Sequence, residues 1–176
     1  VVPLYADEKD RLNHGDLLGG TEIEMDGKNR YDYSADFYTD VLSLLDDNCV
    51  LETDSSVEIE MITRPMSEKA FNSMNWEAAF KKLRDAGWRS HNTDTCGNHH
   101  HYSKYYLGST DKEIRNNARK VCRFFQLFQS DIEKVARRAY GHYCYGWGFE
   151  ITKGMNAHDL WWDRYHAVNL SNLDGI

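Results

Sequence analysis

The chain has 176 residues, a mass of 20.5 kDa and a formal net charge of −7. Its length fits one domain of ordinary size, and a hydrophobic content of 41% is sufficient for a core. The acidic balance argues against nucleic acid as a partner, because phosphate backbones are bound by clustered Lys and Arg. No apolar run approaches the ~20 residues that span a bilayer, so no membrane partner is expected. We therefore expect a single domain over residues 1–176.

Cysteine usage indicates the compartment. The first residues show neither a charged segment nor a long apolar segment of the kind that signal peptides carry. No pair of cysteines has the CxxC spacing, which favours reduced thiols and a cytoplasmic location. The four cysteines are Cys49, Cys96, Cys122 and Cys144.

The first half of the chain alternates between strand and helix signals. Residues 21–25 alternate polar and apolar side chains between glycine-containing breakers, which predicts a strand. Ser34 opens a helical stretch to about Asp46, and residues 57–62 alternate again. A helix is then expected from the N-cap Ser67 to Ala86, with Gly87 following its end.

The second half begins with a strand expected over residues 96–103. Two capping boxes, Thr110 with Glu113 and Ser130 with Glu133, predict helices that run to about residues 128 and 140. Further strands are expected at residues 149–152 and 164–170.

This order of elements is compatible with a parallel sheet, but two early strands carry acidic residues on one face. Parallel strands that are buried on both faces are almost entirely apolar. The acidic alternation instead favours an α+β fold with an open, mainly antiparallel sheet that has one wet, functional face and helices packed on the other.

Two segments of alternating carboxylates are the first candidate site. Glu22 and Glu24 would lie about 7 Å apart on one strand face. Asp54, Glu58 and Glu60 repeat the pattern in the second strand. Carboxylates at such spacing can bind Mg²⁺, with water and substrate phosphates completing the shell, and the alternative is a solvated strand face.

The histidine run is the second candidate site. In a strand, His99 and His101 share one face, where they can hold a metal or donate to phosphate oxygens. There are two alternatives. One is a Zn²⁺ site in which Cys96 joins the histidines, and the other is a polar loop that binds no ligand.

Arginines supply the third candidate site. Arg138, beside Arg137, and Arg164 can bind a phosphate, or they can be plain surface charges.

Several nucleotide and hydrolase motifs are absent from the sequence. It contains no GxxxxGK[ST], no GxGxxG and no GxSxG, so ATP would have to be bound by some other fold.

Five motifs in order resemble the amidoligase family, which belongs to the glutamine synthetase/glutamate–cysteine ligase superfamily of carboxylate–amine ligases. The family has an early G-x-E-x-E strand, a D-G-S element before E-[IV]-[VI]-[ST]-x-P, a C-G-x-H-x-H motif, an Arg followed by aromatic residues, and a final R-Y-x-x-V-N-L strand. The corresponding segments here are Gly20–Glu24, Asp54–Ser56 with Glu60–Pro65, Cys96–His101, Arg137–Tyr140 and Arg164–Leu170.

This resemblance implies a glutamine synthetase catalytic-domain-like fold and an enzyme that uses ATP and Mg²⁺. ATP would phosphorylate a substrate carboxylate, and an amine would displace phosphate from the acyl phosphate to form an amide. Glu22, Glu24 and Glu60, with Asp54, would bind Mg²⁺; Glu60 would also serve catalysis. His99, His101 and Arg164 would contact the nucleotide, and Arg164 with Arg138 would stabilise the transferred phosphoryl group. The family occurs in phages, so the host cytoplasm is an expected location.

The chain departs from the family pattern at several positions. Ser55 replaces a glycine, and Asn98 and His100 replace aliphatic residues. Relatives continue into a T-[IV]-E-[FL]-R strand, so this chain is expected to be truncated or impaired. The alternatives to the ligase are a catalytically inactive binding or structural module and a zinc-dependent hydrolase. The substrate pair is open, with a peptide or a cell-wall fragment among the candidates, and so is the oligomeric state.

Overall fold

The computed structural model describes residues 17–27, 34–53, 57–91, 93, 95–141, 144–160, 165–171 and 173. The chain divides into two compact units, Val1–Ser103 and Lys104–Ile176. Each unit has a separate hydrophobic cluster and is described by itself below. The expectation of one amidoligase-like domain over the whole chain stays a prediction.

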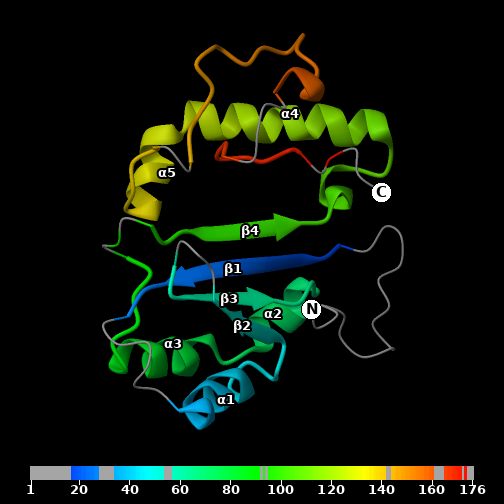
Figure 1. The fold of residues 1–176 in the computed structure, drawn as a ribbon. Helices are drawn as coiled ribbons and strands as arrows, with labels where there is room; N and C mark the ends of the chain where they lie inside the picture. Colours follow the sequence, from blue (N-terminus) through cyan, green and yellow to red (C-terminus); the bar gives the residue numbers. More distant parts are fainter. Residues whose placement is uncertain are drawn as a thin grey trace. The chain divides into compact units, whose positions relative to one another are not determined.

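The first unit is built on an open sheet of four antiparallel strands (Figure 1). Its strands are β1 (Gly19–Met25), β2 (Cys49–Glu52), β3 (Ile59–Thr63) and β4 (Asn98–Tyr102). They lie in the order β2-β3-β1-β4, so β1 is central and β4 is an edge strand. The α+β fold with an open antiparallel sheet is thereby confirmed.

Alternation decides two of these strands. Along β1 and β3 the buried residues alternate with half-buried ones, as the period of two predicts. β2 was not expected, because four residues following a helix are too few to show a period. β2 is defined by its pairing with β3. In this pairing Glu52 of β2 lies opposite Glu60 of β3.

The first helix confirms its sequence prediction. α1 (Ala35–Ser43) begins after Ser34, whose hydroxyl accepts a hydrogen bond from the backbone N–H of Phe37. The N-cap oxygen satisfies one of the orphan donors of the first turn, which explains why the helix starts there.

The single helix expected from Ser67 to Ala86 was wrong. The structure has two helices, α2 (Glu68–Ser73) and α3 (Trp76–Asp85). The break occurs because Met74 is extended and buried, and Asn75 caps α3 by accepting from the N–H of Ala78.

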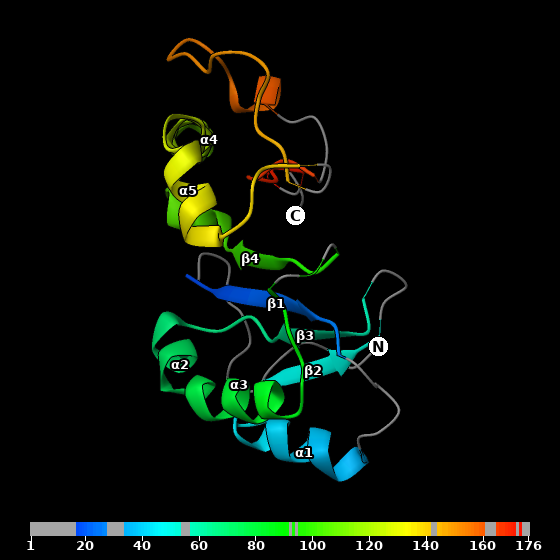
Figure 2. The same ribbon diagram turned by 90° about the vertical axis from the view of Figure 1, so that its left-hand side faces the viewer.

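Helices cover one face of the sheet. In both Figure 1 and Figure 2, the three helices α1, α2 and α3 lie together beside the strands β2 and β3. Side chains of the strands and helices form one buried cluster, and its largest fully buried members are Leu45, Met61, Leu83 and Val41. The opposite set of strand side chains is left for the polar residues described below.

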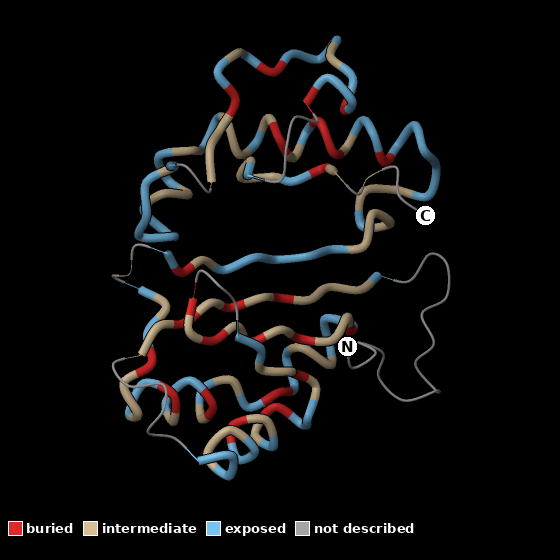
Figure 3. Tube along the Cα trace, in the orientation of Figure 1, coloured by how far each residue is buried: buried red, intermediate tan, exposed pale blue. Residues whose placement is uncertain are grey.

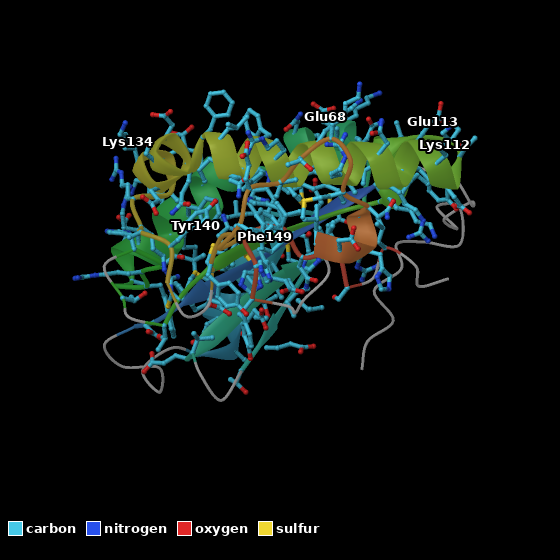
Figure 4. All side chains as sticks on the ribbon, turned by 90° about the horizontal axis from the view of Figure 1, so that it is seen from above. Glu68, Lys112, Glu113, Lys134, Tyr140 and Phe149 are labelled. Atoms are coloured by element: carbon cyan, nitrogen blue, oxygen red, sulfur yellow. The ribbon has the colours of Figure 1, made fainter. Side chains whose placement is uncertain are left out.

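The second unit is organised around α4 (Asp111–Leu127) and α5 (Gln129–Ala136). Thr110 and Glu113 form the predicted capping box at the start of α4. Figure 4 shows Glu113 at this end of the helix and Lys134 on α5. Short 3-10 helices at Lys104–Leu107 and Ala157–Leu160 complete the unit.

The second predicted capping box was wrong. α5 begins at Gln129, and no side chain caps it. Glu133 instead accepts hydrogen bonds from the side chain of Gln129 and from the backbone N–H of Tyr140. The helix ends at Ala136, earlier than expected, because Arg137 takes a left-handed conformation with φ of 53°.

Neither of the two late strands is present in the described residues. Residues 149–152 form no strand, and residues 165–170 contribute only an isolated bridge between His166 and Tyr145. The side chain of Gln126 donates to the carbonyl of Phe149 and accepts from the N–H of Ile151. The side-chain amide of Gln126 therefore makes the backbone hydrogen bonds that a neighbouring strand would otherwise have to make.

Within the residues described, no helix combines the length and the apolar character that a membrane crossing requires.

Candidate functional site

An acidic row crosses three strands of the first unit. Glu24 of β1 pairs with Glu60 of β3, which pairs in turn with Glu52 of β2. Residues directly opposite in an antiparallel pair project on the same face, so the three carboxylates share one face. Like charges in this arrangement repel, which makes the row a favourable place for a cation. Glu52 was missed because β2 was missed.

Two histidines flank Glu22 on the same face. Nδ1 of His99 lies 3.3 Å from one carboxylate oxygen of Glu22, and Nε2 of His101 lies 3.1 Å from the other. The pairing of β1 with β4 causes this contact, because it sets Glu22 opposite His99 and Gly20 opposite His101.

The contacts perturb all three pKa values. Hydrogen bonds from His101 and His99 hold the pKa of Glu22 far below its ordinary value. The hydrogen bond to Glu22 raises the pKa of both His99 and His101, against the opposing effect of burial. The cluster therefore favours an ionised carboxylate between protonated imidazoles.

His100 lies on the other face of β4 and behaves differently. Burial is the largest cause that lowers the pKa of His100, and the charges of the neighbouring His101 and His99 lower it further. Its ring stacks near that of Tyr102, with centroids 6.5 Å apart. The three consecutive histidines thus have two distinct environments, as strand alternation predicts.

Gly97 permits the close approach of Glu24. The backbone N–H of Gly97 donates to Oε2 of Glu24 at 2.5 Å. A Cβ atom at this position would lie 3.2 Å from that oxygen and 3.2 Å from Nε2 of His99. Glycine in the C-G-x-H-x-H segment therefore has a steric reason, since a side chain would push between the acidic residue and the histidine.

The structure brings together five of the residues that the sequence singled out. Glu22, Glu24, Glu60, His99 and His101 share one face of one sheet. Arg138 lies in the second unit, at an exposed position after the end of α5. Asp54 and Arg164 lie outside the described residues.

The carboxylates are suited to Mg²⁺ by donor type, since hard oxygen ligands are what this ion prefers. As the side chains lie, however, no three His, Cys, Asp or Glu residues of the described part are grouped so that they could hold a metal ion. Oxygens of Glu22 face imidazole nitrogens, and Oε2 of Glu24 faces the N–H of Gly97. Metal binding here would require these side chains to exchange those partners for the ion.

Cys96 does not join the histidines. It is buried, its Sγ lies 4.0 Å from the carbonyl oxygen of Arg89, and burial raises the pKa of its thiol. His99 and His101 are exposed and turn toward Glu22. A zinc site would need a thiolate beside both imidazoles, and this group is not formed in the described residues.

Comparison with known proteins gave no match to a protein-family model, to a curated protein or to a solved structure.

Proposed function

We propose that this chain is an ATP- and Mg²⁺-dependent carboxylate–amine ligase of the amidoligase type, with a glutamine synthetase-like catalytic fold. One observation supports the proposal above the others. Three motif segments far apart in sequence meet on one sheet face, where Glu22 and Glu24 lie beside Glu60 and the two histidines. That face presents carboxylates for a divalent cation next to donors for phosphate oxygens.

The roles follow from the chemistry of each group. Glu22, Glu24 and Glu60 would hold Mg²⁺, which neutralises triphosphate charge when it is bound. His99 and His101 would donate to phosphate oxygens after leaving Glu22. Arg164 and Arg138 are proposed for the transferred phosphoryl group, because a guanidinium binds phosphate bidentately.

The reaction proceeds in two displacements. An oxygen of the substrate carboxylate attacks the γ-phosphorus of ATP, and ADP leaves with the bonding electron pair. The amine nitrogen then attacks the carbonyl carbon of the acyl phosphate, inorganic phosphate leaves, and the nitrogen loses a proton. One ATP is thus consumed for each amide bond.

Calorimetry with a non-hydrolysable ATP analogue tests this function. We expect binding that requires Mg²⁺ and is lost in Glu22→Gln and Glu24→Gln. Glu77→Gln is the matched control, since Glu77 is an exposed carboxylate in the first turn of α3. If folded wild-type protein binds no analogue, the ligase proposal is rejected in favour of an inactive module. Stoichiometric zinc in the purified protein would instead indicate the hydrolase alternative.

A further inference from the structure

Helix α4 of the second unit carries a buried arginine. Arg119 is 8% exposed, and among the described residues it is the one charged side chain that is buried. Figure 3 shows buried segments of α4 between exposed ones, and the other buried residues of this helix are Ile114, Ala118 and Cys122. Arginine is almost never fully buried unless it is paired. The charge of Arg119 therefore needs a partner.

The guanidinium of Arg119 has neutral partners in the described part of the chain. Its Nη1 donates to the carbonyl oxygen of Thr152 at 3.3 Å, and its Nη2 donates to Oδ1 of Asn116 at 3.0 Å. A guanidinium has more N–H donors than these two bonds use. Burying an ionised group costs free energy unless an opposite charge offsets it. The two oxygens fix the position of Arg119 without neutralising it.

Arg123, one turn further along α4, has the counterion that Arg119 lacks. Its Nη2 lies 2.9 Å from Oε1 of Glu150, and its side chain is 29% exposed. The less buried arginine thus has a carboxylate, whereas the more buried one has none among the described residues. The sequence of the second unit holds eleven Lys and Arg against eight Asp and Glu, so its positive charge is in excess. An anion from outside the chain can supply the missing charge.

The neighbours of Arg119 add donors that complement such an anion. Asn116, whose Oδ1 accepts from Arg119, also has the two N–H groups of Nδ2, and Thr152 has an exposed hydroxyl. Lys153 follows Thr152 in an exposed turn and forms no ion pair within the described part of the chain. A guanidinium binds phosphate oxygens bidentately, and an ammonium binds them as a point charge. This set of donors fits a phosphate group.

We propose that Arg119, Asn116, Thr152 and Lys153 form a binding site for a phosphate group, carried by inorganic phosphate or by a small phosphate ester. Arg119 supplies the buried positive charge. Asn116 and Thr152 hold the guanidinium in place and add their own donors, and Lys153 adds a second charge. Every one of these residues belongs to the second unit, and the site does not depend on the ligase function.

An NMR titration with inorganic phosphate at constant ionic strength tests the site. We expect saturable shifts of the backbone amides of Thr152 and Lys153 and of the side-chain amide of Asn116. Arg119→Gln should weaken binding about tenfold or more, because it removes the buried charge.

Lys112→Gln is the matched control. It also removes one positive charge from α4, at an exposed position that Figure 4 labels. Position 112 lies ~10 Å along the helix axis from Arg119, which is beyond the ~8 Å Debye length at physiological salt. This variant should bind phosphate within about twofold of the wild type. A loss as large as that of Arg119→Gln would overturn the site, because it would show that only net charge matters.

Lys153→Gln keeps the test decisive if Arg119→Gln does not fold. Lys153 is exposed, so its replacement should leave the fold intact. It should weaken phosphate binding about threefold, through the loss of one screened charge. Unchanged phosphate affinity in Lys153→Gln, or in a folded Arg119→Gln, would overturn the proposal, and so would shifts that do not saturate.

Two comparisons identify the ligand. Acetate should bind about tenfold more weakly than phosphate, because it has a single charge and fewer acceptor oxygens, and equal binding would refute a phosphate site. Tighter binding of glycerol 3-phosphate than of inorganic phosphate would support the site and assign it to an ester, and the reverse order would assign it to the free anion.

Glu22→Gln separates this site from the proposed ligase. Phosphate affinity should be the same in Glu22→Gln as in the wild type, even where nucleotide binding is lost. Phosphate binding at α4 by a protein that binds no nucleotide would support this site and reject only the ligase. Nucleotide binding without any shift at Thr152 and Lys153 in the phosphate titration would reject only this site.

Discussion

Glu24 and Glu60 are direct cross-strand partners on neighbouring strands of the first unit. Opposite carboxylates on adjacent strands destabilise a sheet, so a fold that keeps them forgoes some stability. This arrangement is expected where a bound cation relieves the repulsion. A mutation that removes one carboxylate should then raise stability and weaken cation binding, so the two effects can be measured separately.

Glu60→Gln should raise the free energy of unfolding by about 0.2–1 kcal/mol in the absence of metal and at a pH where His99 and His101 are neutral, because it removes a like charge opposite Glu24. At lower pH the gain should shrink, because Glu60 also favours the protonated forms of both histidines. The same change should abolish Mg²⁺-dependent nucleotide binding. Urea unfolding in EDTA measures the first effect, and calorimetry the second. Glu52→Gln should stabilise less, since Glu52 is exposed whereas Glu60 is half-buried. Destabilisation by Glu60→Gln would contradict the repulsion.

The histidine cluster predicts a defined pH dependence of stability. The folded pKa values of His99 and His101 are raised, chiefly by Glu22, so their stabilisation is complete below about pH 6.5 and is lost as pH rises through the folded values. The folded pKa of Glu22 is lowered, so its stabilisation is present above about pH 4.3 and is lost as pH falls. The cluster is most stabilising between these limits.

Unfolding free energies at pH 6 and pH 8.5 check this dependence. The wild type should lose more stability over this interval than His99→Gln/His101→Gln does. His100→Gln serves as a control of opposite sign, because the lowered pKa of His100 disfavours its protonated form in the folded state. Parallel pH profiles for the wild type and the double variant would rule out the cluster as a stabilising element.

Gly97→Ala tests whether position 97 must be glycine for steric reasons, as distinct from the general effect of a glycine-to-alanine change on the unfolded chain. The new Cβ would lie 3.2 Å from both Glu24 Oε2 and His99 Nε2, so these side chains must shift. We expect a loss of about 1 kcal/mol and weaker nucleotide binding. Gly148→Ala is the control: nothing lies within 4 Å of its Cβ, and it should be neutral or stabilising by up to about 1 kcal/mol. The same outcome for both variants would show that Gly97 has no steric role.

Thr110→Ala and Ser130→Ala test the two sequence capping boxes. Thr110 caps α4, so its replacement should cost about 1 kcal/mol. Ser130 lies inside α5 and caps nothing, so its replacement should be neutral or slightly stabilising through helix propensity. Thermal unfolding of both variants measures the difference, and equal costs would contradict the assignment of the helix starts.

Local sequence signals correctly predicted the strands and helix starts that are decided by a residue and its near neighbours in the chain. The alternation around Ile23 and Ile59 and the caps at Ser34 and Thr110 were sufficient for those elements. β2 was missed because only its pairing with β3 defines it. The strand predicted at residues 149–152 was wrong because the side chain of Gln126, distant in sequence, binds that backbone.

The same limit applied to the site. The carboxylates and histidines were found by spacing, and their sharing of one face followed from alternation. The contacts of Glu22 with His99 and His101 were not predicted, because they require the register between β1 and β4. Glu52 was overlooked for the same reason, since it joins the row only through its strand partner.

The central position of β1 has a consequence for how the chain folds. Its contact with β4 joins residues 77 positions apart, as Glu22 and His99 illustrate. Pairing across such a distance is slow, since the entropy of closing the loop must be lost before any contact is gained. During synthesis, α1, α2 and α3 are complete on the nascent chain before β4 emerges. Until then β1 has an unpaired side and the acidic face lacks its histidines, so any activity that needs these histidines can appear only after β4 is in place.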